Sequence, residues 1–435
     1  MAWTEQQVLA VAPDAASADA GRKLATPGPW SGAGSSDSLL WGSCQGSGSK
    51  PYQVSVDLIG PAYKCTCPSR KFPCKHAIAL LLLWSSGAVG ASGLDAAGAD
   101  APGFAAEWAD RRAGRAAAPA AEADPQAQAA RRAEREAKMD AGVEEFSRWL
   151  TDLARGGLAD AARRPSSWWD AAAARLVDAQ LPGLAERVRD TGEQGATEPA
   201  VLLEQVGVWW MLAKAWTRRA LLPESQRMDL QTALGWTIPT ATVRDGEVRD
   251  GEWLAVGSYR DESGRLAQQR TWLRAPDGEY LMTLDTAGPG QSLGVPQLAG
   301  ARLRTRLGVY PGNAPRRVLF VDPPQPIAEL EPAAPRRLGP GLRVGAALEA
   351  AARTLTTTPW RDRCPVTLDD VAIAVDDRAA YVVDPDGDAL KLCEDTSTAL
   401  LLAVTGGRAD QVFGELSDGT LRVLTVSASG KVAAL

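Results

Sequence analysis

The residues whose types and spacing best suit a chemical role are three cysteines and a histidine that lie within twelve positions of each other. They are Cys65, Cys67, Cys74 and His76, in the segment Cys-Thr-Cys-Pro-Ser-Arg-Lys-Phe-Pro-Cys-Lys-His. The chain of 435 residues holds only six cysteines and one histidine, so half of its thiols and its single imidazole fall in this segment. Three thiolates and an imidazole form the ligand set of a structural zinc ion.

The spacing of these four residues allows all of them to reach one ion. Alternate residues of an extended segment face the same side, so Cys65 and Cys67 can present both sulfurs together. Cys74 and His76 repeat that arrangement after six residues, two of which are prolines that can turn the chain back. Four protein ligands leave no coordination position for water. The segment therefore predicts one structural Zn²⁺ and not a hydrolytic centre.

Two other interpretations of the cysteines are open. Cysteine is often a small buried apolar residue, and this is how we interpret Cys44, Cys364 and Cys393, which have no partner at ligand spacing. A disulfide within the cluster is the second, but cysteines at i and i+2 close poorly, and no feature of the chain indicates an oxidising compartment. We therefore expect the zinc site.

The pattern Cys-x-Cys-x6-Cys-x-His resembles the SWIM-type zinc finger, in which two short ligand pairs flank a variable loop. All four ligand positions match. The flanks fit as well, because residues 52–58 alternate as a strand does and an apolar helix is expected from about Cys74 to Trp84. The resemblance covers about residues 35–87. It implies a β-β-α finger that binds DNA or another protein.

Composition limits the compartment and the partners. The chain has 47 basic and 53 acidic residues and a net charge of −6, so as a whole it does not attract nucleic acid. Residues 1–7 do not resemble a signal peptide, and the most apolar run, at 77–84, is too short to span a bilayer. We expect a soluble cytoplasmic protein with no membrane partner, and the alanine- and arginine-rich composition suggests a bacterial source.

The expected fold class is multidomain α+β, with an N-terminal β-β-α zinc finger, a central α-helical region and a C-terminal β-rich region. The expected boundaries are 1–87 for the finger domain, 88–127 for an Ala/Gly/Pro-rich linker, 128–235 for the helical region and 236–435 for the β-rich region. A proline-rich stretch near 322–340 indicates that the β-rich region consists of two subdomains.

Two glycine- and proline-rich stretches of the amino-terminal part are expected to lack regular structure. Residues 26–34 predict a loop before the strand at 39–44. Residues 88–127 contain few large apolar side chains and are expected to be mostly a flexible linker, in which Phe104 and Trp108 offer an anchoring point.

Apolar periodicity changes once along the rest of the chain. The strongest helix is predicted over 201–222, and the tryptophan pairs at 168–169 and 209–210 are interpreted as core side chains. After Trp236 the period becomes two, apart from a helix expected over 341–355. Asp-Gly pairs between apolar runs predict hairpins at 277–278, 386–387 and 418–419.

Catalytic motifs are missing from the sequence. No Gly-x4-Gly-Lys-Ser/Thr loop occurs, and with His76 on zinc no histidine is left as a general base. The carboxylate pairs Asp369-Asp370 and Asp376-Asp377 are interpreted as surface or turn charges, because neighbours on a strand face opposite sides. We therefore expect no enzyme, and an enzyme in the β-rich half is the second alternative.

The function that the sequence favours is an adaptor whose finger binds a protein partner. Lys64, Arg70, Lys71 and Lys75 surround the ligands and are candidates for phosphate contacts, which keeps DNA binding as the alternative. The same cations balance the charge of about −1 on Zn²⁺ with three thiolates, so protein is favoured. By resemblance, bacterial proteins with such a finger are similar to components that work beside MoxR-type ATPases and von Willebrand-type domain proteins.

Overall fold

The structure is a computed structural model, and it divides into two compact units that are described separately here. Unit 1 comprises Met1–Ala120, Ser258–Thr271 and Thr283–Leu298, and unit 2 comprises Ala121–Gly257, Trp272–Met282 and Ala299–Leu435. The structure describes residues 3, 5–12, 15–36, 38–46, 48, 50–58, 62–69, 73–89, 101–117, 125–193, 198–261, 266–288, 293–327 and 337–435. Among the described residues, no helix combines the length and the hydropathy needed to cross a bilayer.

Unit 1 is built on a four-stranded antiparallel sheet. Neighbouring strands are neighbours in the sequence, in the order β1 (Trp30–Ser35), β2 (Leu39–Cys44), β3 (Tyr52–Asp57) and β4 (Ala62–Cys65). The alternation that predicts a strand at 52–58 is confirmed, since Val54 and Val56 are fully buried on one face of β3.

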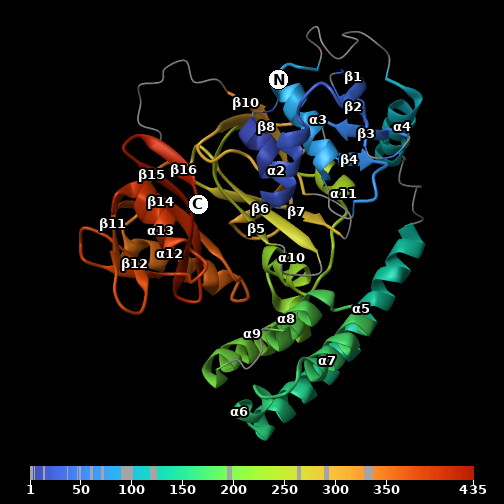
Figure 1. The fold of residues 1–435 in the computed structure, drawn as a ribbon. Helices are drawn as coiled ribbons and strands as arrows, with labels where there is room; N and C mark the ends of the chain where they lie inside the picture. The colour runs from blue at the N-terminus through green and yellow to red at the C-terminus, as the bar shows by residue number, and fades with distance from the viewer. Residues whose placement is uncertain are drawn as a thin grey trace. The chain divides into compact units, whose positions relative to one another are not determined.

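Helix α3 (Lys75–Ser85) lies in the core of unit 1. Eight of its eleven residues are buried, which confirms the prediction of an apolar helix covered on several sides. It packs against the sheet and against α1 (Glu5–Ala10) and α2 (Ala15–Leu24) (Figure 1). Gly21 lets α2 approach closely, because a Cβ there would lie 2.5 Å from a methyl carbon of Ile78.

Strand β1 lies in the stretch that predicted a loop, so that prediction is wrong for residues 30–34. The reason is the packing of a neighbouring tryptophan. A Cβ at Gly34 would come within 2.7 Å of the Trp41 ring, and the pairing with β2 shifts register between Ser31 and Gly34. The glycines of this segment therefore make room for an indole within a sheet.

The stretch expected to be mostly linker contains a helix, α4 (Gly103–Ala117). Its first turns cover one side of β2, and the residues in contact are Phe104, Ala105 and Trp108 on the helix and Leu39 and Trp41 on the strand, both of which are buried. The flexible linker is thus incorrect for residues 103–117, whereas the anchoring point at Phe104 and Trp108 agrees with these contacts. The remainder of the stretch, at 90–100 and 118–124, lies outside the described residues.

Unit 2 begins with a helical bundle, as the sequence predicts. Its helices are α5 (Pro125–Gly156), α6 (Leu158–Ala161), α7 (Ser166–Asp178), α8 (Pro182–Glu193), α9 (Pro199–Thr217), η1 (Arg219–Leu221), α10 (Glu224–Ala233) and α11 (Thr240–Arg244). Trp169 and Trp209 are buried in its core, with Phe146 and Trp149 packed beside them, which confirms their interpretation as core residues. Trp210 is an exception, since it is 38% exposed.

Two six-stranded sheets follow the bundle. The first has the order β10-β8-β5-β6-β7-β9 and β8 also pairs with β9; its strands are β5 (Val248–Asp261), β6 (Ala267–Arg274), β7 (Tyr280–Ala287), β8 (Arg302–Val309), β9 (Arg316–Phe320) and β10 (Gln325–Pro326). The second has the order β13-β12-β11-β14-β15-β16 and β13 also pairs with β15; its strands are β11 (Cys364–Val375), β12 (Ala380–Val383), β13 (Ala389–Leu392), β14 (Arg408–Ser417), β15 (Thr420–Ala428) and β16 (Lys431–Ala434).

Local predictions for this region are confirmed. The Asp-Gly pairs join β6 to β7, β12 to β13 and β14 to β15. In the last hairpin both turn residues, Asp418 and Gly419, have positive φ angles of 48° and 71°, as a two-residue hairpin turn requires. Helices α12 (Val344–Thr357) and α13 (Thr398–Thr405) accompany the second sheet.

Candidate metal centre

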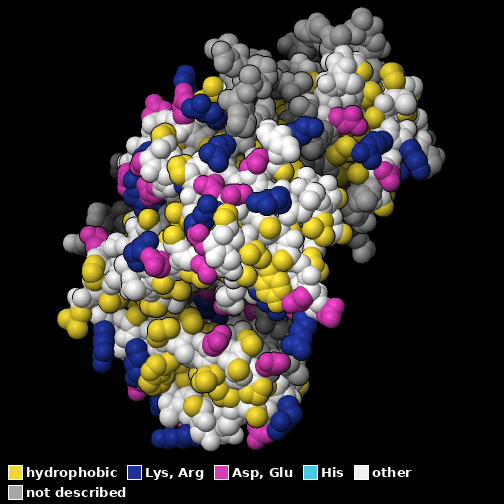
Figure 2. Space-filling model, turned by 90° about the vertical axis from the view of Figure 1, so that its left-hand side faces the viewer, with side chains coloured by type: hydrophobic (Ala, Val, Ile, Leu, Met, Phe, Trp, Pro, Cys, Tyr) yellow, Lys and Arg dark blue, Asp and Glu magenta, His cyan; other side chains and the backbone are white. Residues whose placement is uncertain are grey.

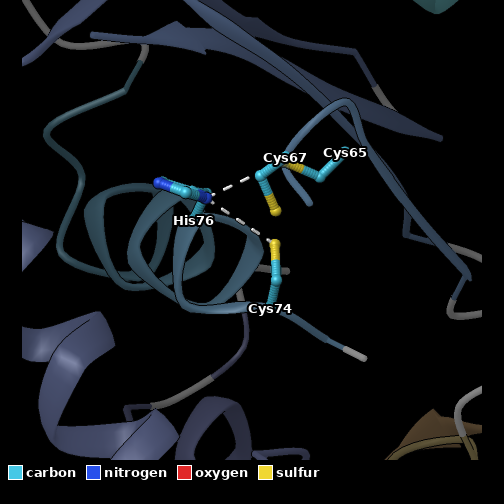
Figure 3. Close-up of side chains that lie close together, drawn as sticks. All are labelled: Cys65, Cys67, Cys74 and His76. Carbon is cyan, nitrogen blue, oxygen red and sulfur yellow. Dashed lines mark hydrogen bonds between the residues drawn. The ribbon is translucent and has the colours of Figure 1, made fainter. Parts of the chain in front are cut away.

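The four predicted zinc ligands come together at the junction of β4 and α3. Cys65 is the last residue of β4, Cys74 directly precedes α3 and His76 lies in its first turn. Their ligand atoms, with that of Cys67, all lie within 4.8 Å of one another (Figure 3). The Sγ atoms of Cys65 and Cys74 are each 3.9 Å from Nδ1 of His76. The structure therefore brings together all four residues that the sequence singles out.

The distances fit a tetrahedral zinc site. Zn–S bonds of about 2.3 Å and Zn–N bonds of about 2.1 Å place neighbouring ligand atoms roughly 3.5 to 3.8 Å apart in a tetrahedron. The two sulfur–nitrogen distances of 3.9 Å are close to this range, and all four ligand atoms lie within 4.8 Å of one another, so a contraction of at most about 1 Å completes the geometry. The donor set of three sulfurs and one nitrogen also suits zinc better than a hard cation such as Mg²⁺.

Burial and an aromatic contact hold the ligands in position. Cys74 and His76 are 1% and 5% exposed, whereas Cys65 and Cys67 are half-buried. The Tyr52 ring lies 4.9 Å from the His76 imidazole, centroid to centroid, and fixes its plane from the β3 side. Sequence reasoning identified Tyr52 only as a strand residue, because nothing in a local pattern shows which ring will lie against the histidine.

The thiol groups differ in their tendency to ionise. A hydrogen bond from the Cys65 thiol, together with contacts to His76 and the backbone N–H of Ala77, lowers the pKa of Cys74 to about 4, although burial acts in the opposite direction. The same interaction with Cys74, together with burial, raises the pKa of Cys65. Burial also raises the pKa of Cys67. The Cys74 thiolate at the start of α3 is therefore available to bind a cation, and the N-terminus of the helix stabilises its negative charge.

The cluster is compatible with one structural Zn²⁺. Cys65, Cys67, Cys74 and His76 would fill all four positions, so a bound ion would have no site for water or substrate. Its role would be to tie the end of β4 and the following loop to the first turn of α3. The core of unit 1 is adjacent, because Cys74 itself belongs to the buried apolar cluster around α3.

Zinc binding is expected to release about two protons per ion near pH 7, because Cys74 is already ionised while Cys65 and Cys67 must lose theirs. Affinity should then fall by roughly a hundredfold for each unit of pH just below neutrality, because two thiols must lose their protons for each ion bound. Calorimetric titration of the metal-free protein in buffers with different ionisation enthalpies measures the proton count. Release of three protons, or none, would show that the ionisation states are assigned wrongly.

Of the four basic residues near the ligands, the structure describes two. Lys64 is half-buried on β4 and Lys75 is exposed at the start of α3. Arg70 and Lys71 lie outside the described residues. A hollow of about 490 Å³ borders the metal cluster, with Cys67, Lys75 and His76 on one side and residues of α2 on the other.

Two known families match separate parts of the chain. Residues 52–84 match the SWIM zinc finger, and residues 134–234 match the SWIM-associated four-helix bundle domain. The first range contains all four ligands, and the second extends from within α5 to the end of α10. Neither the curated proteins nor the solved structures contain a match to this chain.

Proposed function

Because this chain is a SWIM-type zinc finger protein, we propose that it is an adaptor that binds a protein partner through its finger. The observation that carries the proposal is the closed cluster of four ligands, which stabilises a surface and has no catalytic position. SWIM zinc fingers are in general binding modules and not catalytic centres. We propose that the protein is cytoplasmic, because thiols stay reduced and available to zinc in that compartment.

The hollow beside the cluster supports a protein partner. Apolar side chains of Ala20 and Leu24 on α2 and of Pro68 in the metal loop line it, together with polar groups such as Gln45. A volume of about 490 Å³ is enough for a few side chains of a bound segment. Lys75 is the charged residue among those that line it, which is a weak electrostatic basis for binding a phosphate backbone.

A narrower proposal concerns the partner's identity. The finger resembles those of bacterial proteins similar to components that work beside MoxR-type ATPases and von Willebrand-type domain proteins. We propose that the partner is a protein of one of these two kinds and that the chain is an adaptor in an ATP-driven assembly. The resemblance alone supports this step, and purified candidates of both kinds would be the first partners to test.

Site-specific photocrosslinking tests the adaptor proposal. A photoreactive residue at position 75, which is exposed at the edge of the hollow, should yield a covalent adduct with a protein partner in cells. The same residue at position 375, an exposed valine in the second β-sheet, is the matched control and should yield no such adduct. Adducts at both positions, or only nucleic-acid adducts at position 75, would contradict the proposal.

DNA binding through the same finger is the alternative, and a double charge reversal tests it. Lys64→Glu with Lys75→Glu would weaken any phosphate contact, so DNA affinity at low salt should fall by at least about tenfold if the alternative holds. We expect the unaltered protein to show no salt-dependent DNA binding in fluorescence anisotropy. Lys391→Glu with Lys431→Glu makes the same change of charge at exposed positions of β13 and β16, which are not part of the finger, and is the control.

A further inference from the structure

Helix α9 is apolar on its outer side as well as on the side that faces the bundle core. Its inner residues, such as Trp209 and Trp216, are buried. On the outer side Leu203 is 60% exposed, and Met211 and Trp210 are 40% and 38% exposed. A helix at the surface of a globular protein usually has a polar outer side, so this face indicates a contact.

A groove runs between α9 and α5 along this face. It has a volume of about 500 Å³, and its lining is almost entirely apolar. The two helices run antiparallel here, since Trp216 donates to Asp140 at one end while Leu203 shares the groove with Ala154 and Arg155 at the other. The lining residues are Leu150, Thr151, Ala154 and Arg155 on α5 and Leu203, Val206, Gly207 and Trp210 on α9.

Gly207 leaves space in the middle of the groove because it has no side chain. It lies between the bulky side chains of Leu203 and Trp210 on consecutive turns of α9. A Cβ placed on it would meet no atom within 4 Å, so the space above it is free. Glycine lowers the stability of a helix interior by about 1 kcal/mol relative to alanine, and the packing of the bundle does not require it at this position.

A positively charged side chain lies at each end of the groove. Arg155 is the one charged residue among those that line it, and it forms an exposed ion pair of 3.9 Å with Asp152. At the other end the Lys214 ammonium lies 4.2 Å above the Trp210 ring. From Leu203 to Lys214 the helix rises about 16 Å, which corresponds to three turns of a bound helix. Figure 2 shows hydrophobic side chains gathered over the helical bundle in the lower part of the view, with Lys and Arg as well as Asp and Glu side chains around them.

We propose that this groove binds an amphipathic helix of a partner protein, about three turns long, with acidic residues at both of its ends. Apolar side chains at i, i+3 or i+4 and i+7 of the partner helix would enter the groove, with the closest approach at Gly207. Its terminal carboxylates would meet Arg155 and Lys214. This interaction surface is separate from the finger and does not depend on the function proposed for it.

Peptide binding to the full-length, zinc-loaded protein tests the proposal. The probe is a fluorescein-labelled helical peptide of about 14 residues with leucines at i, i+3, i+4 and i+7 and glutamates at both ends. A second peptide carries lysines in place of the glutamates. We expect the unaltered protein to bind the glutamate peptide at least about tenfold more tightly, with the preference decreasing at high salt.

Three variants locate the binding. Gly207→Leu fills the groove without harming the helix, and it should weaken binding by at least about tenfold while the melting temperature stays the same or rises. Arg155→Glu with Lys214→Glu should reverse the preference toward the lysine peptide. Val177→Ser changes an apolar residue that is 43% exposed on α7, away from the groove, and should leave affinity unchanged.

Each other outcome counts against the proposal. Equal affinity for both peptides, or full affinity in Gly207→Leu, would remove the acidic helix as the occupant. No binding of either peptide at millimolar concentration would do the same. A dimer of the unaltered protein in analytical ultracentrifugation that Gly207→Leu dissociates would show that a second copy of the chain occupies the groove. A negative crosslinking result at position 75 has no bearing on these measurements.

Discussion

Replacing Cys74 by serine is expected to abolish zinc binding and to destabilise unit 1 more than any other single change in the chain. Cys74 supplies the pre-ionised thiolate, and it also joins the metal cluster to the buried residues around α3. In small zinc fingers the metal contributes on the order of 10 kcal/mol to folding. That is comparable to the whole stability of a typical domain, about 5–15 kcal/mol, so the variant should lose its cooperative melt.

Elemental analysis and hydrogen exchange measure the two parts of this result. Zinc content should fall from about one ion per chain to almost none. Protection of backbone amides should disappear first in residues 62–69 and in the first turn of α3, where the ion would connect the two segments. The rest of α3 should lose protection later, because its core contacts with α1, α2 and the sheet remain.

Cys44→Ser is the matched control for this experiment. Cys44 is fully buried in the same unit but is not part of the cluster, so its change should lower stability without removing zinc. Cys67→Ser is a second test, since Cys67 is half-buried and its loss disturbs packing less. If Cys67→Ser and Cys74→Ser both retain one zinc ion and a normal melt, the ligand assignment is wrong.

The metal cluster could be predicted from the sequence because its information is local. Four scarce residues within twelve positions allow few arrangements, and the alternation of residues 52–58 indicates which strand precedes them. The same holds for the Asp-Gly turns, whose backbone angles depend on two residues alone. Where a structural element is determined by its own residues, the prediction from sequence is confirmed.

Elements determined by their contacts with other elements could not be predicted. Strand β1 looks like a loop because its glycines accommodate Trp41, a residue of the next strand. Helix α4 looks like a linker because its few apolar side chains pack on β2, about sixty residues earlier in the chain. Trp210 looks like a core residue at helical spacing, and only the fold shows that α9 presents two apolar sides.

Long-range strand pairing is the third kind of information that a local pattern lacks. Strands β5, β6 and β7 each contribute residues to both compact units. The additional pairings of β8 with β9 and of β13 with β15 each join one end strand of a sheet to the last-but-one strand at its other end. Hydrophobic alternation indicates that a strand exists, but it does not indicate its neighbour, since every strand with a buried face has the same period.

Replacing Glu415 by alanine is expected to be the most destabilising single change in unit 2. Its side chain is 1% exposed on β14, where Oε1 accepts a hydrogen bond of 2.8 Å from the Trp272 indole N–H. Arg363 and Arg422 each approach Oε2 to 3.8 Å. Removal of the carboxylate leaves a buried N–H without this acceptor and two guanidinium groups without this counter-charge. The expected loss in the free energy of unfolding is about 3–5 kcal/mol.

Two further variants separate charge from hydrogen bonding at this position. Glu415→Gln keeps an acceptor for Trp272 but removes the charge, so it should cost less than the alanine variant, roughly 1–2 kcal/mol. Glu349→Ala removes a carboxylate that is 76% exposed on α12 and paired with Arg353, and it should change stability by less than about 0.5 kcal/mol. Urea denaturation monitored by the summed fluorescence of the chain's 15 tryptophans measures all three variants. If Glu415→Ala lowers the free energy of unfolding no more than Glu349→Ala does, the buried carboxylate contributes nothing to stability. The arrangement of Trp272, Arg363 and Arg422 around it would then require another explanation.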